Sequence, residues 1–191
     1  MSDEKPSCPT ISFTVHPLAS PFSVPTKTYT SNHPYNTIYY QHVATGALVF
    51  DSSDHILLIQ RAVHDSMPLR WEVPGGACDE EDPSILHGVA RELWEETGLF
   101  AASIGPPVGE GKLFLTRSGR AVCKFHFIVE VENSADGHLE VRLDPNEHQA
   151  YVWVTEEEVR TGRKGDVELK LTTKEQEDVI FEAFKVKIEG R

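Results

Sequence analysis

The chain has 191 residues, a length that fits one domain with some additional chain. Apolar residues make up 39% and charged residues 25%, and no apolar run reaches the roughly 18–20 residues of a membrane span, so we expect no membrane association. The formal net charge of −12 argues against binding to a nucleic-acid backbone, because such binding relies on Lys and Arg.

Residues 1–40 are predicted to form an extended arm laid over the main domain, with the first ten residues loose. Six prolines between Pro6 and Pro34 exclude a long helix in this segment. Residues 11–15 (ISFTV) could form a strand, and a disordered leader is the alternative. Four apolar side chains could hold the arm on a core: Phe13, Val15, Phe22 and Val24.

Two features predict a reduced, cytoplasmic location. The opening residues, MSDEKPSCPT, lack the basic start and the apolar stretch of a secretory signal. The three cysteines, Cys8, Cys78 and Cys123, lie far apart and form no CxxC pair, which argues against a zinc ribbon or a redox dithiol.

From residue 41 the pattern changes to that of an α/β layered domain, which we expect to span residues 41–187. Apolar, β-branched runs at 42–51 and 55–61 flank the sequence DSSD and predict a strand–turn–strand pair. The pattern also predicts strands at 71–76, 112–116, 120–132 and 150–155, and helices at 83–98, from 155–159 and at 171–187. Residues 188–191 are expected to be a flexible end.

The helix predicted over 83–98 carries the most informative pattern. Asp82 is the expected N-cap, Pro83 suits the first turn, and Gly98 is placed to end the helix. One side of the helix should face the core through Leu86, Val89, Ala90, Leu93 and Thr97. Three glutamates gather on a different face: Glu92, Glu95 and Glu96.

These three carboxylates indicate a metal site. Like charges at this spacing repel by a few tenths of a kcal/mol per pair, about 0.2–0.5, even when solvated. Cations that prefer oxygen ligands, such as Mg²⁺ or Mn²⁺, would explain why the carboxylates converge. The alternative is a solvated acidic face, which would also have to account for the glycine loop before the helix and for Arg91.

The segment Gly75–Leu99 resembles the signature of the Nudix hydrolase family. Its second half, residues 91–99 (RELWEETGL), matches every specified position of Arg-Glu-aliphatic-any-Glu-Glu-any-Gly-aliphatic. The preceding WEVPGG is similar to the strand and loop before that box, and the resemblance extends loosely from about Gln41 to the C-terminal helix. It implies a Nudix-type α/β/α sandwich with a mixed sheet between helices.

One spacing departs from the family pattern. Fourteen residues separate Gly76 from Arg91, one more than usual, so the first acidic position of the signature is either Glu81 or Asp82.

The resemblance implies metal-dependent hydrolysis of a phosphoanhydride bond in a nucleoside diphosphate linked to another moiety. Mg²⁺ or Mn²⁺ would be bound by Glu92, Glu95 and Glu96 with a loop carbonyl at Gly75 or Gly76. The resemblance also implies a catalytic role for Glu95. Arg91 would orient a glutamate on its own helix or a neighbouring loop through a bidentate pair.

Residues outside the box complete the predicted site. Glu147 is similar to a loop glutamate that the family often uses as base or additional ligand, although an ordinary turn residue is nearly as well supported. His148 is a weaker candidate, because a loop histidine is usually solvated. Arg61 and Arg70 flank the loop before the box and are predicted to meet substrate phosphates, with surface ion pairing as the alternative.

Other readings of the same pattern stay open. An isoprenoid-diphosphate isomerase would need a catalytic Cys and Glu pair, and the intact box favours hydrolysis instead. A non-catalytic module that senses a nucleotide is the second alternative. The substrate is expected to be a small nucleotide, which leaves oxidised nucleoside triphosphates, dinucleoside polyphosphates and nucleotide sugars. A homodimer, with the arm on a partner subunit, is also open.

Overall fold

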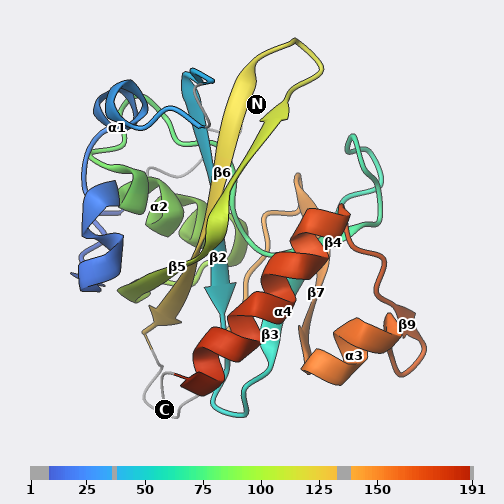
Figure 1. The fold of residues 1–191 in the computed structure, drawn as a ribbon. Helices are drawn as coiled ribbons and strands as arrows, with labels where there is room; N and C mark the ends of the chain where they lie inside the picture. Colours follow the sequence, from blue (N-terminus) through green and yellow to red (C-terminus); the bar gives the residue numbers. More distant parts are fainter. Residues whose placement is uncertain (1–8, 36–37, 133–138, 190–191) are drawn as a thin grey trace, which may run out of the picture.

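The computed structural model describes residues 9–35, 38–132 and 139–189. Groups of strands are interleaved with helices along the chain, which confirms the predicted α/β class (Figure 1). The strands are β1 (Thr14–Val15), β2 (His42–Val49), β3 (Ile56–Arg61), β4 (Trp71–Glu72), β5 (Ala101–Leu115), β6 (Ala121–Val131), β7 (His148–Val154), β8 (Arg163–Lys164) and β9 (Val167–Glu168). The helices are the 3-10 helix η1 (Pro17–Phe22) and the α-helices α1 (Thr26–Asn32), α2 (Ile85–Thr97), α3 (Glu156–Thr161) and α4 (Lys174–Glu189).

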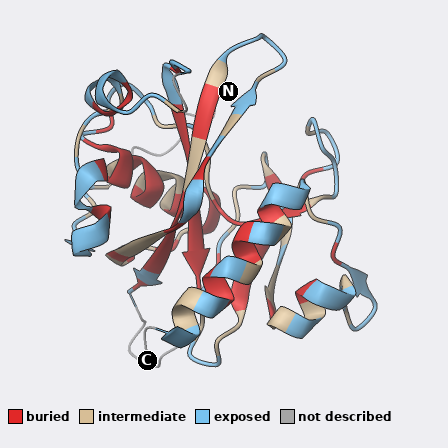
Figure 2. Ribbon diagram, viewed as in Figure 1, coloured by how far each residue is buried: buried red, intermediate tan, exposed pale blue. Residues whose placement is uncertain are grey.

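The larger sheet has the strand order β1-β5-β6-β2 and mixes parallel with antiparallel pairs. β5 and β6 form an antiparallel hairpin, whereas β2 runs parallel to β6 and β1 runs parallel to β5. The smaller sheet, β4-β3-β7, is antiparallel. One apolar cluster lies under α2 and the N-terminal segment, and a second joins α4 to the other face of the larger sheet and to the smaller sheet (Figure 2).

The strand–turn–strand pair predicted from 42–51 and 55–61 is wrong in its pairing. Both strands form, but β2 belongs to the larger sheet and β3 to the smaller one, and a single bridge between Phe50 and Ile56 joins them. The Asp51 carboxylate accepts hydrogen bonds from the N–H groups of Ser53 and His55, which turns the chain sharply between the sheets. Seven of the eight β2 residues are buried, as expected for a strand covered on both faces.

The first half of β5 was not predicted. The strand begins at Ala101, although only 112–116 shows a clear apolar alternation. Glycines and prolines at 105–111 obscure the pattern, and the strand accommodates them through register shifts against β6.

Helix α2 begins later than predicted. Its N-cap is Ser84, whose Oγ accepts from the N–H of His87, and not Asp82, whose carboxylate binds elsewhere. Gly98 ends the helix as predicted, in a left-handed conformation with φ of 70°. The predicted core side is confirmed, because all five of its members are buried: Leu86, Val89, Ala90, Leu93 and Thr97.

The N-terminal segment packs on the α2 side of the larger sheet (Figure 1). Only Thr14–Val15 of the predicted 11–15 strand pairs with β5. Phe22 is buried and its ring stacks on Tyr29 at a centroid distance of 4.8 Å, while Phe127 meets it edge-on at 5.0 Å. Phe13 and Val24 are partly buried against the same cluster, whereas Val15 is exposed.

Helix α4 is shorter at its start than the predicted 171–187. It begins at Lys174, because the Thr173 hydroxyl accepts from the N–H of Gln176 and caps the first turn. The helix continues to Glu189, and the predicted end residues 190–191 lie outside the described ones. Among the described residues, no helix combines the length and the apolar character needed to cross a membrane.

Candidate metal and catalytic site

The loop between β4 and α2 passes close to the backbone of β2 and to a box carboxylate, and it leaves no room for a side chain at Gly75. A Cβ on Gly75 would lie 2.2 Å from the carbonyl oxygen of Thr45, and φ at Gly75 is +146°, which side chains rarely adopt. A Cβ on Gly76 would lie 2.5 Å from the Glu92 carboxylate. The loop therefore sits directly over the carboxylates of the box.

This loop also runs along the outer edge of β2. Three backbone hydrogen bonds join the two segments: Thr45 N–H to Gly76 C=O (2.8 Å), Ala47 N–H to Pro74 C=O (2.8 Å) and Cys78 N–H to Val43 C=O (2.9 Å). The position of the loop is thus fixed by the most buried strand of the larger sheet.

Glu96 is the most deeply buried carboxylate of the box, with 5% of the residue exposed. One of its oxygens accepts the N–H of Gly75 at 2.6 Å. Burial raises the pKa of Glu96 well above its ordinary value, and the charges of Glu92, Glu72 and Glu147 raise it further, against the lowering effect of the Gly75 bond. Burial likewise raises the pKa of Glu92. Several negative charges thus converge in a space that water reaches poorly.

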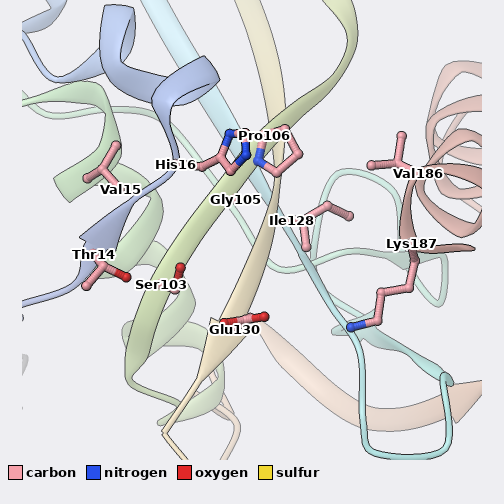
Figure 3. Close-up of a pocket in the computed structure, with 10 residues that line it drawn as sticks. All are labelled: Thr14, Val15, His16, Ser103, Gly105, Pro106, Ile128, Glu130, Val186 and Lys187. Carbon is pink, nitrogen blue, oxygen red and sulfur yellow. The ribbon is translucent and has the colours of Figure 1, made fainter. Parts of the chain in front are cut away.

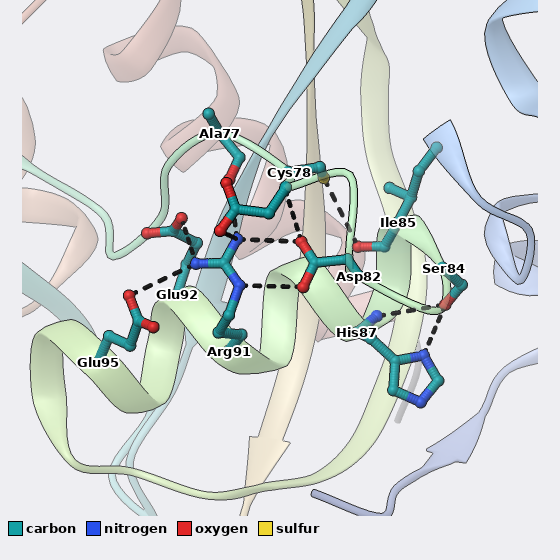
Figure 4. Close-up of polar contacts among 10 residues, drawn as sticks. Ala77, Cys78, Asp82, Ser84, Ile85, His87, Arg91, Glu92 and Glu95 are labelled. Atoms are coloured by element: carbon teal, nitrogen blue, oxygen red, sulfur yellow. Dashed lines mark hydrogen bonds and ion pairs between the residues drawn. The ribbon is translucent and has the colours of Figure 1, made fainter. Parts of the chain in front are cut away.

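Arg91 joins the helix to the glycine loop, as Figure 4 shows. Its Nε and Nη2 atoms donate to the two oxygens of Asp82 at 2.9 and 3.0 Å, and Nη2 also donates to the carbonyl of Ala77 at 2.9 Å. Nη1 lies 2.8 Å from Glu92 and 3.4 Å from Glu95. Burial alone would lower the pKa of Arg91, but these carboxylates raise it overall. The predicted bidentate pair exists, and its partner is a loop aspartate.

The arrangement decides between the two candidates for the first acidic position. Asp82 faces Arg91, whereas Glu81 is exposed. The Asp82 carboxylate also accepts the N–H of Asp79 at 2.8 Å, which folds the longer loop back on itself.

A second group of side chains reaches Glu96 from the start of β7. The ligand atoms that Glu96, Glu147 and His148 offer lie within 4.8 Å of one another. Opposite ligands of an octahedral Mg²⁺ lie about 4 Å apart, so carboxylate and imidazole atoms at this spacing fit a divalent cation after small movements. The structure therefore brings Glu147 to the box, at the place that the sequence predicted for it.

His148 is not the solvated loop residue that the sequence predicted. It is the first residue of β7, only 3% exposed, and its Nε2 lies 3.4 Å from Glu72 and 3.9 Å from Glu96. Among the described residues, no hydrogen-bond partner reaches its Nδ1 atom. The alternation that continues from 150 back to 148 was the signal for a buried histidine.

Glu72 is a member of the site that the sequence analysis missed. It is buried in β4, where Arg61 and His148 both contact its carboxylate. Burial acts to raise the pKa of Glu72, but the His148 hydrogen bond and the charges of Lys124 and Arg61 lower it overall. An acid inside a predicted strand, between Trp71 and Val73, could have indicated this role, because acids are almost never buried unless paired.

The two arginines predicted to meet phosphates are differently placed. Arg61 binds carboxylates of the protein itself, Glu72 and Asp65, the latter at 2.5 Å. Arg70 donates through Nη1 to the carbonyl of Leu171 at 3.3 Å. These contacts agree with the ion-pairing alternative for Arg61, and a substrate role for either residue stays a prediction.

A separate hollow lies away from these carboxylates, between β1, β5 and the end of α4 (Figure 3). Its volume is about 500 Å³, and its polar lining includes Thr14, His16, Ser103, Glu130 and Lys187. None of the box glutamates lines it, so the hollow is distinct from the candidate metal site.

The fold and the box place the chain in a known family. The NUDIX domain family matches residues 40–174, well over half of the chain, and the chain therefore belongs to this family. The family assignment and the fold expected from the box are both confirmed.

Particular relatives match parts of the chain. The human m7GpppN-mRNA hydrolase NUDT17 is 31% identical over 121 residues, which cover 57% of this chain and 37% of that protein. The Danio rerio 8-oxo-dGDP phosphatase NUDT18 is 30% identical over 108 residues, covering 56% of this chain and 30% of the relative. The matched stretches thus span well under half the length of these relatives.

Solved structures agree in fold. The MutT protein from Methanosarcina mazei Go1 superposes with a TM-score of 0.56 at 26% identity, covering 83% of this chain and 98% of that one. The NUDIX domain of Shewanella oneidensis NrtR, solved in complex with ADP ribose, gives a TM-score of 0.58 at 19% identity, covering 84% and 97%. At that identity the second comparison shows the fold alone.

Proposed function

We propose that this protein is a divalent-metal-dependent hydrolase that cuts a phosphoanhydride bond in a nucleoside diphosphate linked to another moiety. The observation that carries the proposal is the buried Glu96 carboxylate, met by Glu92, Glu147 and His148 beneath a glycine loop. Buried like charges are costly without a cation, and carboxylates select Mg²⁺ or Mn²⁺ among divalent ions.

Different residues of the chain have different roles in this reaction. Bound Mg²⁺ or Mn²⁺ would neutralise the diphosphate and lower the pKa of the attacking water. The Gly75 N–H holds the Glu96 carboxylate in one orientation, and Arg91 fixes the loop through Asp82. Glu147 accepts a proton of the water as the water oxygen bonds to phosphorus, and the bridging P–O bond breaks with its electron pair leaving on the oxygen of the departing phosphate group. Glu92, Glu95 and Glu96 act with the Gly76 carbonyl as ligands.

Two relatives support the substrate class. The names of the human and Danio rerio proteins describe hydrolysis of an mRNA cap and of 8-oxo-dGDP, both of which contain phosphoanhydride bonds. We propose a small nucleotide of this kind for the present chain, rather than a nucleic-acid backbone, because its net charge is −12. We also propose a cytoplasmic location, which the separate thiols of Cys78 and Cys123 support.

We propose the same division of the chain as the sequence predicts: an arm at 1–40, the hydrolase domain at 41–187 and a short end at 188–191. A nucleotide-sensing module without catalysis is the second candidate, and the NrtR domain, solved in complex with ADP ribose, is an example of this fold with a nucleotide bound. The complete set of box carboxylates favours the hydrolase.

The first test combines metal dependence with one substitution. Phosphate release from a panel of nucleoside diphosphate derivatives is measured with Mg²⁺, with Mn²⁺ and with a chelator. We expect metal-dependent release of at least one member, and we expect Glu96→Gln to lower kcat/KM by about 10³-fold or more, because the amide loses the ligand charge.

Glu81→Gln is the matched control, since Glu81 is an exposed acid of the same loop. It should keep kcat/KM within about twofold of the wild type. Turnover of Glu96→Gln near the wild-type rate would contradict the proposed role of the box, and tight nucleotide binding without any turnover would favour the sensing module.

A further inference from the structure

A second cavity, here called the α4 cavity, lies where α4 packs against β5 on the face of the larger sheet opposite α2 (Figure 1). Its volume is about 410 Å³, within the range of about 300–1,000 Å³ that small-molecule pockets occupy. It is lined by Val108, Gly109, Glu110 and Lys112 of β5, by His126 of β6, and by Glu175, Asp178, Val179 and Glu182 of α4. No glutamate of the box is among these residues, so the α4 cavity is separate from the candidate metal site.

The lining of the α4 cavity is strongly acidic. Three of its acids, Glu175, Asp178 and Glu182, follow one another along α4 at i, i+3 and i+7 and therefore lie on one stripe of the helix. At a rise of 1.5 Å per residue this stripe is about 10 Å long. Glu110 adds a fourth carboxylate from β5, against a single lysine, Lys112, among the described lining residues. The cavity therefore favours a ligand with positive charge.

Most of these carboxylates are not neutralised by the protein. Among the residues that the structure describes, Asp178 lies 3.3 Å from Lys174, whereas no cationic nitrogen comes within 4.0 Å of Glu110, Glu175 or Glu182. Glu175 lies in the first turn of α4, where the helix dipole favours an acid. Glu182 is two turns further along and Glu110 is on a strand, so the dipole explains neither of them.

Glu182 reaches from the helix to the backbone of β5. A Cβ on Gly109 would lie 2.9 Å from its Oε2 atom, and φ at Gly109 is +67°, a conformation that favours glycine. The register of β5 against β6 is irregular over this stretch, between Val108 and Lys112. Glu110, the next residue of this bulge, lines the same cavity, so carboxylates from two elements face one space.

A buried histidine supplies an independent sign of a ligand. His126 lines the α4 cavity and is only 7% exposed, yet its Nε2 has no hydrogen-bond partner among the described residues. Burial, and then the charge of Lys124, lower the pKa of His126 to about 3, so the ring is neutral. In the tautomer with its proton on Nδ1, the ring would offer an acceptor to an N–H donor. A buried polar atom without a partner costs free energy, which a donor from a ligand would recover.

We propose that the α4 cavity binds a linear organic polyamine. Its ammonium groups would meet the carboxylates along the stripe and Glu110, and its methylene groups would lie on Val108 and Val179, which are both buried in the lining. A single metal ion fits less well, because the acids extend over about 10 Å. Among the described residues, the metal-binding group that the structure brings together is Glu96, Glu147 and His148, outside this cavity. The proposal does not depend on the hydrolase function.

The first experiment measures amine binding without metal. Spermidine is titrated calorimetrically into the full chain at fixed ionic strength in the presence of EDTA. We expect Glu110→Gln and Glu182→Gln each to raise the Kd by about fivefold, because each removes a carboxylate that meets an ammonium group. Lys112→Met removes a repelling charge from the lining and should lower the Kd by about threefold.

The control separates the cavity from the general attraction of an acidic protein for cations. Glu189→Gln makes the same change of net charge at an exposed residue of α4 that does not line the cavity. Its Kd should stay within about 1.5-fold of the wild type, since exposed charges at a distance are screened. An equal rise of the Kd in Glu189→Gln and Glu182→Gln would mean that spermidine follows the net charge alone, which would overturn the proposal.

A comparison of ligands tests the extended cation. Butylamine, which carries a single ammonium group, should bind at least about 20-fold more weakly than spermidine, because it meets fewer carboxylates. Equal affinities would contradict a site built along the stripe. In a titration without EDTA, displacement of spermidine by an equimolar amount of Mg²⁺ would show a metal site in place of an amine site.

A spectroscopic measurement locates the bound amine. Long-range ¹H–¹⁵N spectra of the imidazole groups are recorded with and without saturating spermidine, and we expect the ring nitrogens of His126 to shift while those of His64, an exposed histidine outside the cavity, do not. Heat of binding with an unchanged His126 would place the amine elsewhere and overturn the site. The Tm of Glu110→Gln and Glu182→Gln should stay within about 2 °C of the wild type, since both residues are exposed, so a changed Kd would not reflect misfolding.

Discussion

At the scale of single residues, the site depends on a glycine without a side chain as much as on its charged side chains. Gly75 brings its N–H to Glu96 because no Cβ keeps it from Thr45. The Nε2 atom of His148 lies 3.4 Å from Glu72 and 3.9 Å from Glu96, although neither His148 nor Glu72 belongs to the box. The surroundings of the box carboxylates therefore include residues that its signature does not name.

Gly75→Ala should destabilise the protein strongly. The new Cβ would meet the Thr45 carbonyl oxygen at 2.2 Å in a backbone conformation that alanine rarely adopts. We expect a loss of more than about 2 kcal/mol in the free energy of unfolding, measured by urea denaturation. Gly119→Ala is the control, because φ is +80° there and no atom lies within 4 Å of the added Cβ. That variant should lose only about 1 kcal/mol, and equal losses would mean that the close approach at Gly75 is unimportant.

The sequence predicts individual site residues well where a pattern repeats. The glutamates of α2 and Arg91 follow from helical spacing and from the box, because both depend on the local chain alone. The burial of His148 and the ion pair between Glu72 and Arg61 arise from β3, β4 and β7 meeting in the smaller sheet. Such contacts depend on tertiary pairing, which no local pattern specifies.

At the scale of elements, the glycine loop and α2 act as one unit. Arg91 on the helix binds Asp82 and the Ala77 carbonyl in the loop, so its side chain joins the two segments directly (Figure 4). The helix begins only at Ile85, with Ser84 as its N-cap, which leaves Asp82 free of a capping role and available to Arg91.

Asp82→Asn should therefore impair activity more than stability. The amide keeps one hydrogen bond to Arg91 but loses the charge-assisted bidentate pair, so the loop would position the ligands less well. We expect kcat/KM to fall by about 10–100-fold in the metal-dependent assay. Glu81→Gln again serves as the control, and a comparable fall in that variant would show that Glu81, and not Asp82, holds the first acidic position.

At this scale, the sequence predicts most strands but not which strands pair with one another. Residues 42–51 and 55–61 are both strands, as predicted, yet their apolar character does not say which strand each will pair with. β2 pairs with β6, more than 70 residues away, and not with β3, its neighbour in the sequence. In this position β2 is buried on both faces. The start of β5 was missed because glycine and proline suppress the alternation that defines a strand.

At the scale of the whole molecule, the larger sheet separates two apolar clusters. The N-terminal segment contributes to the cluster under α2, and α4 to the one on the other face. Helix α2 thus carries the box glutamates on one side while its other side is anchored in a core that includes residues from before residue 41.

Phe22→Ala should show that the N-terminal segment stabilises the domain. The ring is 7% exposed and contacts Tyr29 and Phe127, so its loss should cost about 3–4 kcal/mol in the free energy of unfolding. Leu18→Ala in the same 3-10 helix is the control, since Leu18 is 64% exposed and should change stability by less than about 0.5 kcal/mol. Urea denaturation measures both, and a small effect at Phe22 would mean that the segment is not part of the cooperative fold.

The contact between the glycine loop and β2 has a consequence for solubility. β2 is an outer strand of the larger sheet and apolar along most of its length, a combination that invites pairing with another chain. The loop occupies that edge with three backbone hydrogen bonds. A lesion that detaches the loop would therefore uncover a template for edge-to-edge aggregation. The same few bonds that fix the loop beside the carboxylates also cover this edge of the sheet.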